Sequence, residues 1–171
     1  MPSIFSPEQR AQYERDGYVI IRALFDNEEI GLMRDAMEQD PALRASLYDR
    51  KDAEGKSTRM ALWNHPGDSV YGLAARWHRV GRVDHGVLPG EQVGANLRRV
   101  EEMKKQLELV YVELEPGDAL FFHANVMHRS DQNRSPNRRW TVLFCYNAAR
   151  NNPYLEHHHP QYTPLNKVDD D

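Results

Sequence analysis

The sequence has 171 residues, a length typical of one domain with a single core, so two full domains are not expected. Hydrophobic residues make up 40% of it and charged residues 28%, which excludes collagen-like, coiled-coil and broadly disordered chains. The formal charge is -4 and bases are scattered among acids, so no nucleic-acid partner is expected.

Cysteine content and apolar runs bear on the compartment. The single cysteine, Cys145, cannot form an internal disulfide, and the first residues show neither the basic start nor the apolar stretch of a signal peptide. No apolar run approaches the length of a membrane span. These features predict a soluble, cytoplasmic protein without a membrane partner.

The first quarter of the chain carries clear helix signals. A capping-box pattern begins at Ser6 and predicts a helix that ends at Gly17. Residues 18–21 are β-branched or aromatic and predict a strand. A second capping box at Asp26 predicts another helix, which Pro41 stops or restarts. Its apolar stripe is expected to face the core, and consists of Ile30, Met33 and Met37.

The rest of the chain alternates loops, one helix and short strands. Residues 49–57 are charged or small and predict a surface loop, and Asn96 can cap an amphipathic helix over residues 97–106. Residues 115–118 have turn chemistry, with Gly117 where positive φ is tolerated. The predicted strands are residues 109–112, 119–122 and 140–146. Residues 151–171 predict an extended surface tail.

Two histidines and one arginine are candidate site residues. His123 and His128 are five apart, so on an extended strand they point to opposite faces, and one of them is expected to be structural. Arg139 and Thr141 share a face of the last predicted strand. A guanidinium beside a hydroxyl can receive a carboxylate. The alternative is a surface arginine at the entrance of a strand.

Several motifs carry a resemblance to a known family. The strongest are residues 116–123 (PGDALFFH), 127–133 (MHRSDQN) and 139–141 (RWT), supported by residues 5–9, 16–21, 81–86, 145–150 and 162–165. Together they resemble the phytanoyl-CoA dioxygenase family of Fe(II)/2-oxoglutarate oxygenases. The resemblance implies an α+β fold built on a double-stranded β-helix (jelly-roll, cupin-like), here partial, with helices packed on one side.

The resemblance also implies a site. In the family, a His-x-Asp pair and a distal histidine hold the iron, and an arginine anchors the far carboxylate of 2-oxoglutarate. By motif, His128 corresponds to the distal metal ligand, Arg139 to the anchor and Thr141 to the hydroxyl beside it. His128 and Arg139 are therefore expected to point into one concave space, with Thr141 beside Arg139. The implied cofactors are Fe(II) and 2-oxoglutarate, and the implied activity is hydroxylation of a small organic substrate. No residue is assigned as a catalytic acid or base.

One part of the family pattern is missing. None of the eight histidines is followed two residues later by Asp or Glu, so the sequence has no His-x-Asp pair. The family would place that pair between two segments that meet here at Arg76 and Trp77, which predicts an internal deletion. We expect one domain over residues 1–171, with a helical and strand part (1–76), the later part of the β-helix (77–150) and a tail (151–171).

Other residues could substitute for the missing ligand. His65-Pro66-Gly67 has the His-x-Gly form of halogenating relatives but lies in turn chemistry, and Asp84 and His85 are adjacent and point apart on extended backbone. The triplet 157–159 is all histidine, and adventitious metal binding is the more natural interpretation of it. Cys145 is expected to be a small core residue.

Three hypotheses follow. The first is an oxygenase of this family that is impaired by the loss of the His-x-Asp segment. The second is a non-catalytic remnant that keeps a carboxylate-binding pocket or self-associates through open sheet edges. The third is a gene-model, splicing or assembly product. The transcript sequence across Arg76 and Trp77 and a 2-oxoglutarate turnover assay distinguish them.

Overall fold

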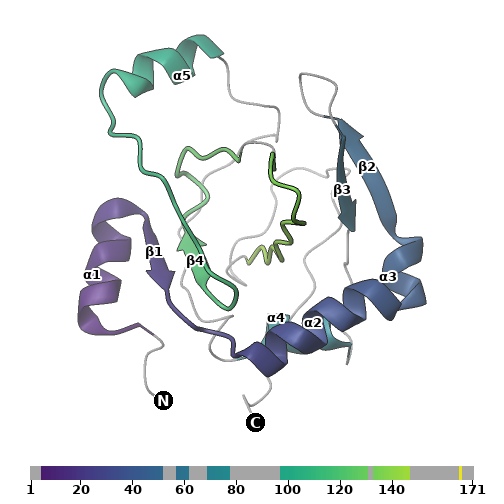
Figure 1. The fold of residues 1–171 in the computed structure, drawn as a ribbon. Coiled ribbons are helices and arrows are strands. Elements are labelled where there is room, and N and C mark those ends of the chain that lie inside the picture. Colours follow the sequence, from purple (N-terminus) through teal and green to yellow (C-terminus); the bar gives the residue numbers. More distant parts are fainter. Residues whose placement is uncertain are drawn as a thin grey trace.

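The computed structural model describes residues 5–51, 57–61, 69–77, 97–130, 133–146 and Asn166, and Figure 1 shows their arrangement. These residues form a mixture of helices and strands, as the sequence predicts. In chain order the elements are α1 (Pro7–Asp16), β1 (Tyr18–Ile21), α2 (Asn27–Gln39), α3 (Pro41–Ala45), β2 (Leu47–Lys51), β3 (Ser57–Ala61), α4 (Val70–Arg76), α5 (Leu97–Lys104) and β4 (Ala119–Phe122).

Helix α1 begins and ends where its sequence predicts. The Ser6 hydroxyl accepts a hydrogen bond from the Gln9 backbone N–H at 3.2 Å, and the Gln9 side chain accepts one from the Ser6 N–H at 2.8 Å. This capping box satisfies two N–H groups at the start of the helix. Gly17 ends the helix with a φ of 76° and donates its N–H to the Tyr13 carbonyl.

Helices α2 and α3 are separated at a single residue. The Asp26 side chain caps α2 through the Glu29 N–H at 2.9 Å, and the Asp40 side chain caps α3 through the Ala42 N–H at 2.8 Å. Pro41 is the first residue of α3, so the predicted stop and restart at this proline is confirmed.

The core is formed by apolar side chains of α2, α3 and α4 together with Phe25. Met33 on the predicted stripe is 6% exposed, and Ile30 and Met37 pack against the same cluster, which confirms the predicted core face. The Tyr71 hydroxyl of α4 donates to the Met33 carbonyl of α2 at 2.6 Å. This hydrogen bond joins two helices that lie side by side in Figure 1.

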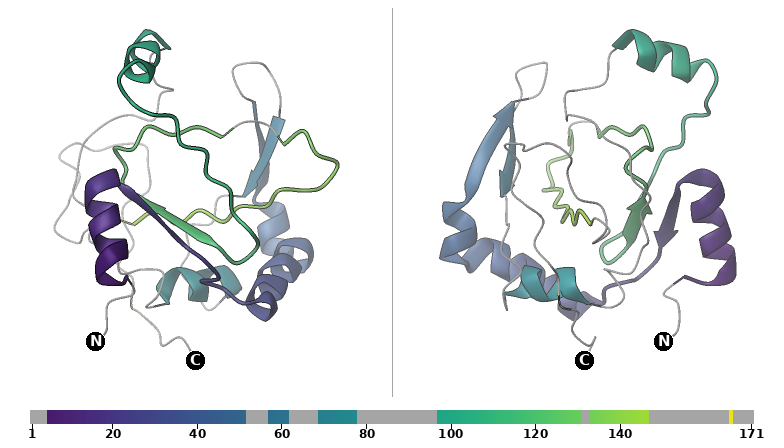
Figure 2. Two further views of the ribbon diagram at one scale, coloured as in Figure 1. Left: turned by 60° about the vertical axis from the view of Figure 1, so that its left-hand side comes forward. Right: turned by 180° about the vertical axis from the view of Figure 1, so that it is seen from behind.

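A two-stranded antiparallel sheet joins the early and late parts of the chain. Strand β1 pairs with β4, with Tyr18 opposite Phe122 and Ile21 opposite Ala119. Val19 in this pair is 0% exposed. Figure 2 shows the two strands side by side in both views. Both strands are where the sequence predicts them, and their pairing connects residues about a hundred positions apart.

The prediction of a surface loop over residues 49–57 is wrong at both ends. Strands β2 and β3 form an antiparallel pair in which Lys51 lies opposite Ser57. Asp49 and Arg59 are cross-strand partners, and the Arg59 Nε lies 3.1 Å from the Asp49 carboxylate. Opposite charges on neighbouring strands stabilise the pair. Charged residues can therefore belong to a strand even where their composition predicts a loop.

The predicted strands at residues 109–112 and 140–146 are also wrong. Both segments are described, and neither pairs with another strand among the described residues. A strand requires a neighbouring backbone to complete its ladder, and apolar patterning does not supply one. The predicted alternation nevertheless holds at the end of the second segment, where Phe144 and Tyr146 pack against the core and Leu143 and Cys145 are exposed. The expectation that Cys145 is a core residue is therefore wrong.

The double-stranded β-helix is not confirmed. Within the described ranges, each sheet contains two strands. The described helices include none that combines the length and apolar character of a membrane span. The predicted tail over residues 151–171 lies outside the described residues, except for Asn166. At the predicted junction, Trp77 directly follows α4.

Candidate metal and carboxylate site

The candidate site residues follow a tight turn at residues 115–118, which precedes β4. Gly117 in this turn has a φ of 94°, and a Cβ at this position would lie 2.3 Å from the Phe25 carbonyl oxygen. The Phe25 N–H donates to the Gly117 carbonyl at 3.0 Å. Only glycine combines the positive φ with this close backbone approach, so the predicted role of Gly117 in the turn is confirmed.

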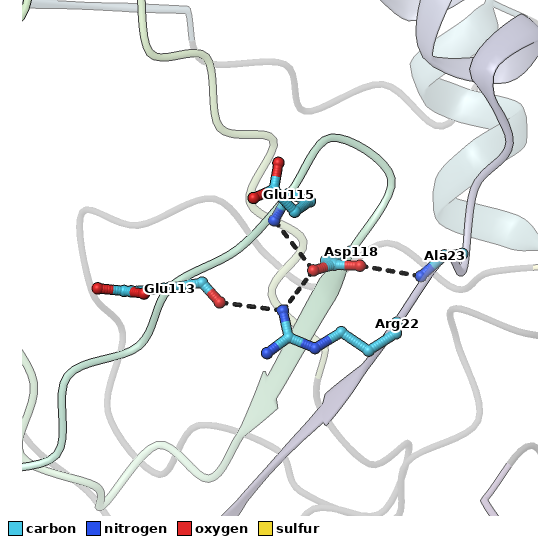
Figure 3. A network of polar contacts seen from close by, with 5 residues as sticks. All are labelled: Arg22, Ala23, Glu113, Glu115 and Asp118. Carbon is cyan, nitrogen blue, oxygen red and sulfur yellow. Dashed lines mark hydrogen bonds and ion pairs between the residues drawn. The ribbon is translucent and has the colours of Figure 1, made fainter.

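Asp118 connects this turn to the end of β1, as Figure 3 shows. Its carboxylate accepts hydrogen bonds from the Ala23 N–H at 2.9 Å, the Glu115 N–H at 3.0 Å and the Arg22 guanidinium at 2.5 Å. These bonds, the two backbone N–H groups first, lower the pKa of Asp118 to about 2. Arg22 also donates to the Glu113 carbonyl at 3.0 Å. The network fixes the start of β4 and therefore the direction in which the chain reaches His123.

His123 has a structural role in the described chain. Its backbone N–H donates to the Gly17 carbonyl at 2.8 Å, and its carbonyl accepts from the Val126 N–H at 2.9 Å. The ring Nδ1 lies 3.2 Å from the Asn125 N–H and accepts its hydrogen bond. An accepting Nδ1 carries no proton, so in the neutral ring the proton is on Nε2. These contacts agree with the expectation that one of the two histidines is structural.

His128 is held in the opposite tautomer. Its Nδ1 lies 2.9 Å from the Val126 carbonyl oxygen, and because a carbonyl only accepts, Nδ1 carries the proton. The ring packs edge-on against Phe122, with 4.6 Å between ring centroids. In the neutral imidazole, Nε2 then presents its lone pair. A histidine that donates one ring N–H to a backbone carbonyl is oriented in the way typical of metal ligands.

Arg139 and Thr141 lie on an exposed part of the chain that follows a structured loop. In that loop the Asn133 side-chain oxygen accepts hydrogen bonds from the Ser135 N–H at 3.1 Å and from its hydroxyl at 2.8 Å. Within the described residues, this loop directly precedes Arg139. That His128, Arg139 and Thr141 line one concave space stays a prediction.

The described residues do not complete an iron site. Among them, no group of three His, Cys, Asp or Glu side chains is arranged to hold a metal ion, and His128 is a single candidate ligand. The possible substitutes lie outside the described residues, and are His65, Asp84, His85 and the 157–159 triplet. The donor set therefore fits Fe(II) only in part, which agrees with the absence of a His-x-Asp pair from the sequence.

Two contributors to this region were missed by sequence reasoning. Phe122 was assigned only to a strand, and its contact with His128 depends on the turn between them. Arg22 directly follows β1 and donates a hydrogen bond to Asp118, although the two residues are 96 positions apart in the sequence. No local pattern marks either role, although the Pro116-Gly117-Asp118 motif does signal that the turn has a specific conformation.

Comparison with known proteins places these features in a class. Residues 78–141 match the family model described as Phytanoyl-CoA dioxygenase (PhyH). The chain is also 29% identical to the ectoine dioxygenase of Stutzerimonas stutzeri (strain A1501) over 83 residues, which are 47% of this chain and 28% of that protein. The match thus spans less than a third of the length of this curated relative. No solved structure matches.

Both matches are to dioxygenases. They support membership of the chain in the phytanoyl-CoA dioxygenase family, and the resemblance predicted from the motifs is confirmed.

Proposed function

We propose that the chain carries the later half of an Fe(II)/2-oxoglutarate oxygenase site, with His128 as a metal ligand and Arg139 and Thr141 as the receptor for the far carboxylate of 2-oxoglutarate. The substrate that is hydroxylated would be a small organic molecule, as the name of the related ectoine dioxygenase suggests. All three residues lie within residues 78–141, the segment that matches the family model.

The hydrogen bond between His128 Nδ1 and the Val126 carbonyl is the observation that carries the metal assignment. Val126 fixes the proton on Nδ1, and Phe122 restricts the ring, so the nitrogen with the lone pair has a defined direction. His123 lies five residues earlier but uses its Nδ1 within the local turn. This difference supports His128, and not His123, as the ligand.

Arg139 supplies the charge complement to a carboxylate. A guanidinium can donate two parallel hydrogen bonds to a carboxylate, and the Thr141 hydroxyl can donate a third from the same side of an extended chain. The pair is exposed in the described chain, so a dicarboxylate can reach it from solvent. This arrangement supports binding of 2-oxoglutarate by the carboxylate that does not react.

We further propose that the activity is impaired. Bound Fe(II) would supply the oxidative chemistry in which decarboxylation of 2-oxoglutarate is coupled to hydroxylation. The sequence lacks a His-x-Asp pair, and one histidine is a weak site for a divalent metal. The family match begins at residue 78, directly after the predicted junction at Arg76 and Trp77, which supports an internal deletion there.

The test is succinate formation from 2-oxoglutarate in the presence of excess Fe(II), measured for the full chain and for His128→Ala. We expect weak or absent turnover in both. Robust turnover that His128→Ala abolishes would contradict the proposed impairment and would direct attention to Asp84 and His85 as replacement ligands. Measurable turnover that His128→Ala lowers would support an impaired oxygenase, whereas absent turnover with retained 2-oxoglutarate binding would identify a carboxylate-binding remnant.

A further inference from the structure

Among the described residues, two segments of the chain expose runs of large apolar side chains to solvent. Together these side chains form an apolar surface that a partner could cover.

Part of this surface lies on an acidic segment, which we define as residues 107–115 (LELVYVELE). It leads from α5 to the turn before β4 and pairs with no strand among the described residues. Its charged side chains are all glutamates. Its apolar side chains are exposed on both sides of the chain, with Tyr111 at 81%, and are Leu107, Leu109, Val110, Tyr111, Val112 and Leu114.

A second part lies on a basic segment, which we define as residues 134–143 (RSPNRRWTVL). Its charged side chains are all arginines, and it too pairs with no strand in the described part of the chain. Its large apolar side chains are exposed and are Trp140, Val142 and Leu143. Among the described residues, both segments thus lack a strand partner and expose apolar side chains, and their charges are opposite.

In one antiparallel register, charged, aromatic and aliphatic side chains of the two segments lie opposite suitable partners. If Glu113 lies opposite Arg138, then Tyr111 lies opposite Trp140 and Leu109 opposite Val142. Opposite charges and aromatic pairs directly across two strands stabilise them. A shift of one residue in either direction would lose the pairing of Tyr111 with Trp140.

We propose that two copies of the chain form a closed two-fold dimer in which the acidic segment of each copy pairs with the basic segment of the other. The same contact occurs twice, as two-fold symmetry requires. The pairing adds strand hydrogen bonds between the two segments, and it covers the exposed apolar side chains. This interface does not depend on metal or 2-oxoglutarate binding.

Two charge reversals test the dimer. Glu113→Arg alters only a side chain that points away from Arg22 in Figure 3, since Arg22 contacts the Glu113 backbone carbonyl. Arg138→Glu alters a side chain that is 79% exposed and lies 3.8 Å from Glu38. Each variant places like charges opposite each other at both contacts. We expect the dimer dissociation constant of each to rise at least about tenfold at low salt, measured by analytical ultracentrifugation.

Mixing the two variants gives the decisive result. In a mixed dimer, the reversed acidic segment of one copy faces the reversed basic segment of the other, and the remaining two native segments also face each other. Both contacts are again complementary, so an equal mixture is expected to recover the wild-type affinity. A folding defect in either variant would not be repaired by mixing.

A matched control reverses a charge outside both segments. Glu14 on α1 is exposed, and Glu14→Arg is expected to leave the dimer unchanged. The proposal is overturned if the wild-type chain is a compact monomer at all concentrations. It is also overturned if assembly continues beyond a dimer, or if the equal mixture stays as weakly associated as each variant alone.

Discussion

The carboxylate of Asp118 accepts a hydrogen bond at 2.9 Å from the backbone N–H of Ala23, a residue 95 positions earlier in the chain. This single contact ties the turn before β4 to the end of β1. Arg22 and Glu115 add two further donors to the same carboxylate. The side chain is 6% exposed, so its charge is stabilised by these donors and not by bulk water.

Replacement of Asp118 by asparagine should weaken the folded state. The variant loses the charge that pairs with Arg22, and its amide nitrogen cannot accept from the backbone N–H groups. We expect a lower midpoint of thermal unfolding by circular dichroism. Asp35→Asn is the control, because Asp35 is exposed and lies 3.9 Å from Arg34. An equal effect of both substitutions would contradict the role of the Asp118 network.

Acid should weaken the same network. The pKa of Asp118 falls from 3.8 to about 2 in the folded state. A group with a lowered folded pKa binds protons more readily when unfolded, so its stabilisation is present above 3.8 and is lost as the pH falls toward about 2. The measurement is the free energy of unfolding by urea across this range. We expect Asp118→Asn to remove this part of the pH dependence, and an unchanged profile would argue against it.

Gly117→Ala should destabilise the chain strongly for its size. Gly117 has a φ of 94°, and the added Cβ would clash with the Phe25 carbonyl oxygen. We expect a loss of about 1–3 kcal/mol in the free energy of unfolding. Gly31 in α2 has no atom within 4 Å of an added Cβ, so Gly31→Ala should stabilise by about 0.5–1 kcal/mol. Chemical denaturation of both variants compares them, and opposite signs are the expected result.

Tyr71→Phe should test the contact between α2 and α4. The Tyr71 hydroxyl donates to the Met33 carbonyl at a buried position. Its removal leaves that carbonyl without this donor, and we expect a loss of about 1–2 kcal/mol in unfolding free energy. Tyr48→Phe is the control, since Tyr48 is 43% exposed and should change little. Equal effects of the two would show that the hydroxyl of Tyr71 does not stabilise the core.

Local signals in the sequence predict the first part of the fold well. The caps at Ser6 and Asp26, the break at Pro41 and the strand at residues 18–21 depend on near neighbours, so short patterns suffice. The pairing of β1 with β4 and the contact of Arg22 with Asp118 join distant segments, and no pattern in one sequence specifies them. The prediction of strands at residues 109–112 and 140–146 was wrong for the same reason. An apolar pattern indicates which side chains would share a face, but it does not identify the neighbouring strand.

The candidate site was predictable only as a set of residue types. The motif around His128 and the pair of Arg139 and Thr141 could be named from the sequence, and their common concave space remains a prediction. The tautomers of His123 and His128 depend on the backbone of residues 125 and 126. Spacing in the sequence therefore distinguishes the faces of the two histidines, but not which ring nitrogen carries the proton.

The most direct test of the account is a calorimetric titration of 2-oxoglutarate into the full chain and two arginine variants. Arg139→Ala removes the proposed anchor, whereas Arg138→Ala removes its exposed neighbour and serves as the control. We expect saturable binding that Arg139→Ala weakens at least about tenfold, the change expected when a charge-assisted pair is lost, while Arg138→Ala has little effect. Binding that is unchanged in Arg139→Ala, or equally reduced in both variants, would contradict the assignment of this segment to a 2-oxoglutarate site.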